Sequence, residues 1–62
     1  MTAESHDLLD AVSLFLYVAT RKDIELERER LEAKHDCILR AFEVEHPTIR
    51  KRRCTRVTWE IL

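Results

Sequence analysis

The chain contains no glycine and a single proline, Pro47, among its 62 residues. Glycine usually occupies positions that need a positive φ, such as phosphate-cradling loops and the tight turns that carry catalytic nucleophiles. We therefore expect neither a cofactor nor enzymatic activity. The single proline constrains the fold further, because a helix that approaches it must end before it.

A chain of this length has room for one domain, residues 1–62, with a core worth roughly 3–5 kcal/mol. Its two cysteines allow at most one intrachain disulfide. We expect self-association to supply the missing stability. Residues 8–19 fall short of the ~20 apolar residues that span a bilayer, and the chain does not begin with a basic and apolar leader. A cytoplasmic protein with reduced thiols and no membrane contact is expected.

The apolar residues between positions 8 and 19 recur at helical spacing. Thr2 or Ser5, followed by acidic residues, suits the start of a helix. The pattern predicts a helix over residues 5–20. Its apolar surface is wider than one opposing helix can cover, which favours either dimerisation or recognition of a target protein.

A second helix is predicted over residues 22–45. Thr20 and Asp23 have the spacing of a capping box, and the helix must stop before Pro47. If the two helices were continuous, the apolar residues of the second would line up with the polar side of the first. A break near residues 21–23 avoids this conflict, so an antiparallel hairpin is favoured over one long rod.

The pattern changes after Pro47. A basic run at residues 50–53 is followed by Val57, Trp59 and Ile61, which alternate with polar residues. This period of two predicts a strand or extended tail over residues 49–62. A lone strand leaves its edges unpaired, so we expect it to pair with a second copy, lie across the helices or bind a partner.

These segments predict a mainly α fold: a two-helix antiparallel hairpin with a short C-terminal strand or tail, assembled as a homodimeric helical bundle. In size and outline, this small helical interaction domain resembles short regulatory proteins of phages, viruses and plasmids, such as the Rop-like RNA-binding hairpin dimers and the phage quorum-sensing anti-activators. The resemblance covers architecture alone and carries over no residue. The expected protein and dimer interface comprises Leu8, Val12, Phe15, Leu16, Ala19, Ile24, Leu31, Ile38 and Phe42.

Two histidines and two cysteines supply the atom types of a zinc site: His35, Cys37, His46 and Cys54. Residues two apart on a helix point about 200° apart, so His35 and Cys37 cannot both face one ion. We expect no metal site. A bridge between the two cysteines is geometrically conceivable if the strand folds back on the second helix, although a reducing compartment disfavours it.

The basic cluster at residues 50–56 is the sharpest functional feature, with five cations within seven residues. It could bind phosphates, bind an acidic protein surface, or protect a strand edge from aggregation. The favoured hypothesis is a dimeric regulator, an inhibitor or adaptor of a larger host protein. The alternatives are a dimeric nucleic-acid-binding protein that uses residues 50–56, and a structural assembly domain. The expected partner-binding residues are Tyr17, Arg50, Lys51, Arg52, Arg53, Arg56 and Trp59.

Overall fold

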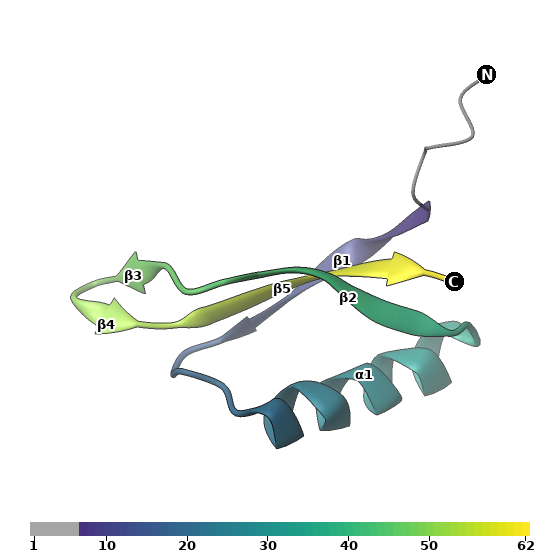
Figure 1. The fold of residues 1–62 in the computed structure, drawn as a ribbon, viewed down its shortest axis with the longest axis horizontal. Coiled ribbons are helices and arrows are strands. Elements are labelled where there is room, and N and C mark those ends of the chain that lie inside the picture. Colours follow the sequence, from purple (N-terminus) through teal and green to yellow (C-terminus); the bar gives the residue numbers. More distant parts are fainter. Residues whose placement is uncertain (1–6) are drawn as a thin grey trace.

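The computed structural model describes residues 7–62, and its strands form two antiparallel sheets (Figure 1). The larger sheet has the strand order β1-β5-β2, and a separate two-stranded ribbon is made by β3 and β4. Because β1 and β2 both run antiparallel to β5, they are parallel to each other, as in a split βαβ unit. The elements are β1 (Asp7–Phe15), α1 (Arg21–His35), β2 (Leu39–Glu45), β3 (Thr48–Ile49), β4 (Arg52–Arg53) and β5 (Thr55–Ile61).

The helix α1 begins where the sequence predicts it. The Thr20 hydroxyl accepts a hydrogen bond from the Asp23 backbone N–H at 3.1 Å, and the Asp23 carboxylate accepts one from the Thr20 N–H at 3.0 Å, so the capping box is confirmed. The helix ends at His35, and the C-cap residue Asp36 takes a left-handed conformation with φ of 51°. Asp adopts this conformation more readily than most residues. Within residues 7–62, no helix is long and apolar enough to cross a membrane.

The prediction of a mainly α, two-helix hairpin is wrong. The predicted homodimeric helical bundle is wrong as well, because it requires two helices in each chain and residues 7–62 contain one. The segment predicted as a helix over residues 5–20 contains the strand β1, and the expected cap at Thr2 or Ser5 lies outside the described residues. The helix predicted over residues 22–45 ends at residue 35, and residues 39–45 form β2. The sequence does place a strand near the C-terminus, but β5 is the central strand and is hydrogen-bonded on both sides.

Pairing within the sheet explains why β1 is a strand despite its helical spacing. Ser13 lies opposite Val57 and Phe15 lies opposite Thr55, so both face α1 together with the interior side of β5. Leu14 pairs with Arg56 on the opposite face. The central strand needs a neighbour on each side to satisfy its backbone N–H and C=O groups, and this tertiary requirement overrides local periodicity.

The core lies between α1 and one face of the three-stranded sheet. It is formed by Leu31 of α1, Leu39 of β2, and Val57 and Trp59 of β5. Val57 and Trp59 have no exposed surface. Each fully buried side chain of this kind contributes about 1.5–3 kcal/mol. The helix and the two outer strands are therefore held together through β5.

A polar relay connects the core tryptophan to the helix. The Trp59 indole N–H donates to the Ser13 hydroxyl at 2.9 Å, and that hydroxyl donates to the Glu27 carboxylate at 2.6 Å. The Arg30 guanidinium, then the Ser13 hydroxyl, hold the pKa of Glu27 below its ordinary value, against the opposing effect of burial. The ionised carboxylate therefore stabilises the fold above the pKa of an unfolded glutamate, and this contribution is lost as pH falls through its folded pKa.

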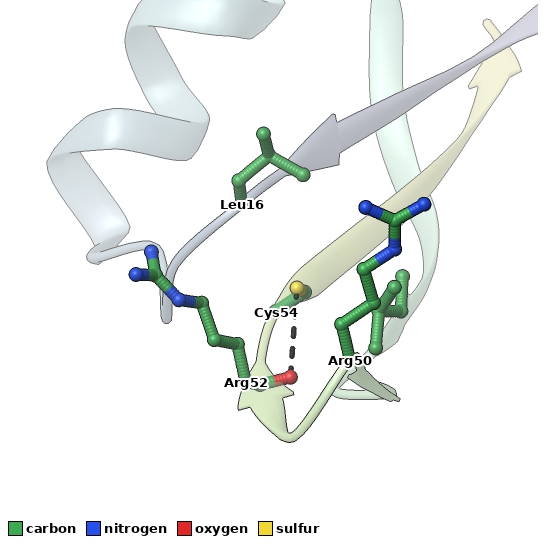
Figure 2. A pocket seen from close by; sticks show the side chains of 5 residues that line it. Leu16, Arg50, Arg52 and Cys54 are labelled. Atoms are coloured by element: carbon green, nitrogen blue, oxygen red, sulfur yellow. Dashed lines mark hydrogen bonds between the residues drawn. The ribbon is translucent and has the colours of Figure 1, made fainter.

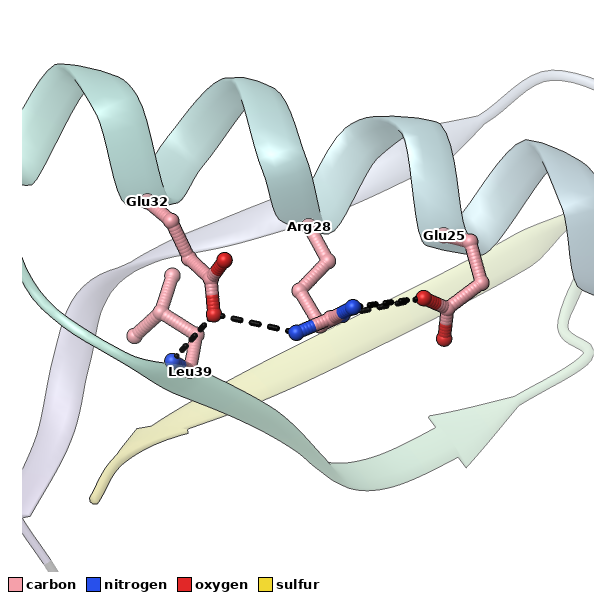
Figure 3. A network of polar contacts seen from close by, with 4 residues as sticks. All are labelled: Glu25, Arg28, Glu32 and Leu39. Atoms are coloured by element: carbon pink, nitrogen blue, oxygen red, sulfur yellow. Dashed lines mark hydrogen bonds and ion pairs between the residues drawn. The ribbon is translucent and has the colours of Figure 1, made fainter.

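A second relay fixes the start of β2 (Figure 3). The Glu32 carboxylate accepts a hydrogen bond from the Leu39 backbone N–H at 2.8 Å and forms an ion pair with Arg28 at 3.1 Å. Arg28 also pairs with Glu25 at 2.7 Å. Glu32 therefore joins the helix to the sheet.

We predict that Ser13→Ala lowers the free energy of unfolding by about 1–3 kcal/mol, because the buried Trp59 indole N–H loses its acceptor. Ser13→Thr, which keeps the hydroxyl on a residue suited to strands, is the matched control. Urea unfolding followed by Trp59 fluorescence measures both variants. A Ser13→Ala protein as stable as the parent would contradict the role assigned to this bond.

Candidate functional site

The strands β3 and β4 form an arm that extends past the end of the three-stranded sheet (Figure 1). Thr48 pairs with Arg53 and Ile49 pairs with Arg52, so the connecting loop consists of Arg50 and Lys51 alone. We call residues 48–53 the basic arm. It is the tip of the hairpin that links β2 to β5, continued beyond the region that α1 covers.

The turn at the tip holds two cations in a conformation that disfavours them. Arg50 has φ of 51° and Lys51 has φ of 64°. A two-residue hairpin loop with positive φ at both positions fits a type I′ turn, for which Asn-Gly is the preferred pair. The left-handed conformation costs roughly 1–2 kcal/mol for an ordinary L-residue. Strain of this kind is typical of functional positions.

Charge is strongly segregated along the chain. Residues 46–59 contain five cations and no aspartate or glutamate, and every acidic residue except Glu60 precedes residue 46. Ion pairs among the described residues engage Arg28, Arg30, Arg40 and Arg56, and none of these pairs involves the basic arm. The arm therefore presents Arg50, Lys51, Arg52 and Arg53 exposed to solvent and without a carboxylate partner in residues 7–62.

The base of the arm is fixed by hydrogen bonds around Thr55, which is fully buried. Its hydroxyl accepts a hydrogen bond from the Ala19 backbone N–H at 2.9 Å and lies 3.1 Å from His46 Nδ1. The Cys54 N–H donates to the Pro47 carbonyl at 2.9 Å. These contacts attach both strands of the arm, and the loop before α1, to the end of β5.

A pocket of about 320 Å³ opens at the base of the arm (Figure 2). Leu16, Ile49 and Cys54 supply its apolar lining, and Arg50 and Arg52 line it as well. The Cys54 thiol donates a weak hydrogen bond to the Arg52 carbonyl at 3.7 Å. The pocket therefore combines an apolar lining with two guanidinium groups.

The structure brings only some of the predicted partner-binding residues together. Arg50, Lys51, Arg52 and Arg53 share the arm, but Trp59 is fully buried and cannot contact a partner at the surface. Arg56 lies on β5 in an ion pair with Glu45 at 2.9 Å. Tyr17 is exposed and rests edge-on against Phe15, with ring centroids 5.8 Å apart.

The residues predicted as an interface fall in separate places. Leu31 lies in the core, where Phe15 and Ile24 pack against it, and Ala19 is half-buried before α1. Leu8, Val12, Leu16, Ile38 and Phe42 are exposed. Leu8 and Val12, with Leu14, pair with Glu60, Thr58 and Arg56 and so lie on the sheet face opposite α1. We call Leu8, Val12 and Leu14 the apolar row.

The candidate metal ligands do not converge. Within residues 7–62, no group of three or more histidine, cysteine, aspartate or glutamate side chains is placed to hold a metal ion. Cys37 and Cys54 are free thiols, and the conceivable bridge between them is not formed. His46 contacts Thr55 at the base of the arm.

Sequence reasoning found the cations but missed the hairpin that presents them. The signal for it is Thr48 and Ile49 before a two-residue break, with Thr55 and Val57 after it, because β-branched residues favour strands. The usual Asn-Gly marker is absent. Comparison with protein-family models, curated proteins and solved structures finds no match to this chain.

We predict that replacing the turn by Arg50→Asn with Lys51→Gly raises the free energy of unfolding by roughly 1–2 kcal/mol, because both residues tolerate positive φ. Denaturant unfolding measures the change against the parent chain. A variant of unchanged or lower stability would contradict the turn geometry and the strain assigned to it.

Proposed function

We propose that this protein binds nucleic acid, with the basic arm contacting the phosphate backbone. The observation that carries the proposal is the set of four exposed cations at residues 50–53, presented on a two-stranded arm in a segment free of carboxylates. Two-stranded ribbons are known to enter nucleic-acid grooves. Three of the four cations are arginines. One planar guanidinium group can donate two parallel hydrogen bonds to the oxygens of a phosphate.

Charge distribution also favours a defined orientation of binding. The formal net charge is −1, so the protein as a whole is not attracted to a polyanion. Residues 1–45 contain eleven acidic residues but only six arginines and lysines, whereas the arm is purely cationic. A polyanion would therefore meet the arm and be repelled elsewhere. Each phosphate neutralised contributes a slope of about −0.9 to the dependence of log K on log salt.

An acidic protein surface is the competing partner for the same arm. Protein interfaces usually obtain most of their binding energy from buried aromatic and arginine anchors. The only tryptophan is already in the core, and Ile49 is the only large apolar residue in the arm. A cationic arm without an aromatic anchor is therefore better suited to the uniformly charged phosphate backbone of a nucleic acid than to a protein surface, where buried side chains supply most of the binding energy.

We predict that the arm variant Arg50→Asn with Lys51→Gly binds a fluorescent oligonucleotide at least about tenfold more weakly at low salt, with a salt slope shallower by about 2. This variant is expected to be more stable than the parent, so misfolding does not explain a loss. Fluorescence anisotropy across a salt series measures both quantities.

Single substitutions provide a matched pair of controls. Lys51→Gly and Lys34→Gln each remove one cation, the first from the arm and the second from the last turn of α1. Only Lys51→Gly should weaken binding. Equal effects of the two variants, or no binding by the parent at low salt, would contradict the proposal. The proposal would also be contradicted if the arm captured an acidic protein in the presence of nuclease and the protein bound no oligonucleotide. That result would assign the arm to protein recognition.

A second candidate function, self-association, is supported by the apolar row. Leu8, Val12 and Leu14 are 48%, 55% and 49% exposed on the sheet face that α1 leaves open. The rest of that face carries the ion pairs Arg40–Glu60 and Arg56–Glu45. Two copies related by a two-fold axis would bring this row against itself. The resulting dimer would carry two basic arms and bind a polyanion more tightly than one arm can.

We predict that Leu14→Arg converts a dimer to a monomer, because it places like charges at the centre of the interface. Leu26→Arg, on an exposed position of α1, is the control and should leave the dimer intact. Sedimentation equilibrium gives the mass of each protein. A monomeric parent chain, or equal dissociation of both variants, would contradict self-association through the apolar row.

A further inference from the structure

We infer that the pocket at the base of the arm accepts an unpaired nucleobase, so that the target is single-stranded or looped nucleic acid. This inference rests on the proposed function and names the class of nucleic acid that the same site would select. The pocket is lined by Leu16, Ile49, Arg50, Arg52 and Cys54. It is therefore formed jointly by the arm, the start of β5 and the segment that follows β1.

The lining is suited to a flat, mainly apolar group with charged neighbours. Leu16 and Ile49 are 65% and 37% exposed, so their side chains are accessible, whereas Cys54 is buried at 2%. Figure 2 shows Cys54 between the two arginines, with Leu16 across the opening. A base could place its faces against these aliphatic groups. The pocket has a volume of about 320 Å³, which is larger than a nucleobase and leaves room for the attached sugar.

The two arginines connect base binding to backbone binding. Arg50 and Arg52 belong both to the pocket lining and to the row of arm cations. Guanidinium groups stack on bases and also pair with phosphates, and both interactions recur in the recognition of single strands. A base in the pocket would thus hold its own flanking phosphates within reach of the arm. The match of apolar lining with flanking positive charge favours a nucleotide over a neutral ligand.

A regular duplex cannot use this pocket, because its bases are stacked and paired. Extruding one base from a duplex costs a few kcal/mol, and a single strand or a loop avoids that cost. The arm can still contact duplex phosphates. The pocket should therefore create a preference for single strands on top of electrostatic binding that both forms share.

The first test compares a fluorescent single strand with a duplex of the same length. The parent protein should bind the single strand about tenfold more tightly, because only an unpaired base can leave water and pack against the apolar lining. Leu16→Ser should remove this preference while leaving duplex affinity and the salt slope unchanged, since it removes a lining residue and no charge. Leu26→Ser, at an exposed position on α1, is the control and should keep the preference.

The outcomes separate this inference from the proposed function. Equal binding of both forms by the parent, or an equal loss on both forms in Leu16→Ser, would overturn the pocket assignment and leave electrostatic binding by the arm in place. Binding of neither form would overturn both proposals. A preference that Leu16→Ser abolishes and Leu26→Ser retains supports the inference.

A second test reads the pocket directly through its thiol. In a Cys37→Ser background, Cys54 is the single cysteine, and its reaction with a small thiol reagent reports access to the pocket. A saturating single strand should slow this reaction, whereas a saturating duplex should not. Protection by a short fatty-acid carboxylate, without protection by the single strand, would overturn the inference and assign the pocket to an amphipathic anion.

Discussion

The burial of Trp59 on the central strand is the constraint on which the rest of the structure depends. Its ring packs in the core with Leu31 of α1, and its indole N–H donates to the Ser13 hydroxyl of β1. The same hydroxyl donates a hydrogen bond to the carboxylate of Glu27 in α1. One side chain thus joins the first strand, the helix and the last strand, which are far apart in the sequence. Without it, a chain of this size would have little core to organise the sheet.

The sequence contained enough information for the helix start and the C-terminal strand, and too little for the two outer strands β1 and β2. Thr20 and Asp23 act locally, so their capping box could be read directly. β1 could not be predicted in this way, because the spacing of its apolar residues fits a helix. Pairing with β5 determines that it forms a strand. The end of α1 was missed because Asp36 adopts a positive φ without glycine. The cations of the site were visible in the sequence, but the hairpin, the pocket and the burial of Trp59 depend on tertiary structure.

The basic arm follows from the same topology. The hairpin between β2 and β5 continues past the end of the sheet, and Thr55 ties its base to the segment before α1. Beyond that point the residues of β3 and β4 are exposed, so cations can occupy both positions of a turn whose backbone disfavours them. A sequence shaped by stability alone would place Asn-Gly there. The presence of Arg50 and Lys51 at these positions therefore favours a role in binding.

We propose that nucleic acid binds at the arm and the adjoining pocket. An NMR titration of the isotope-labelled protein with a short single strand at low salt tests this most directly. Binding at this site should shift the backbone amide signals of residues 48–54 and of Leu16, and leave the signals of the Trp59 indole and the exposed face of α1 unchanged. Shifts centred on α1 or on the apolar row, or a spectrum that the single strand leaves unchanged, would contradict it.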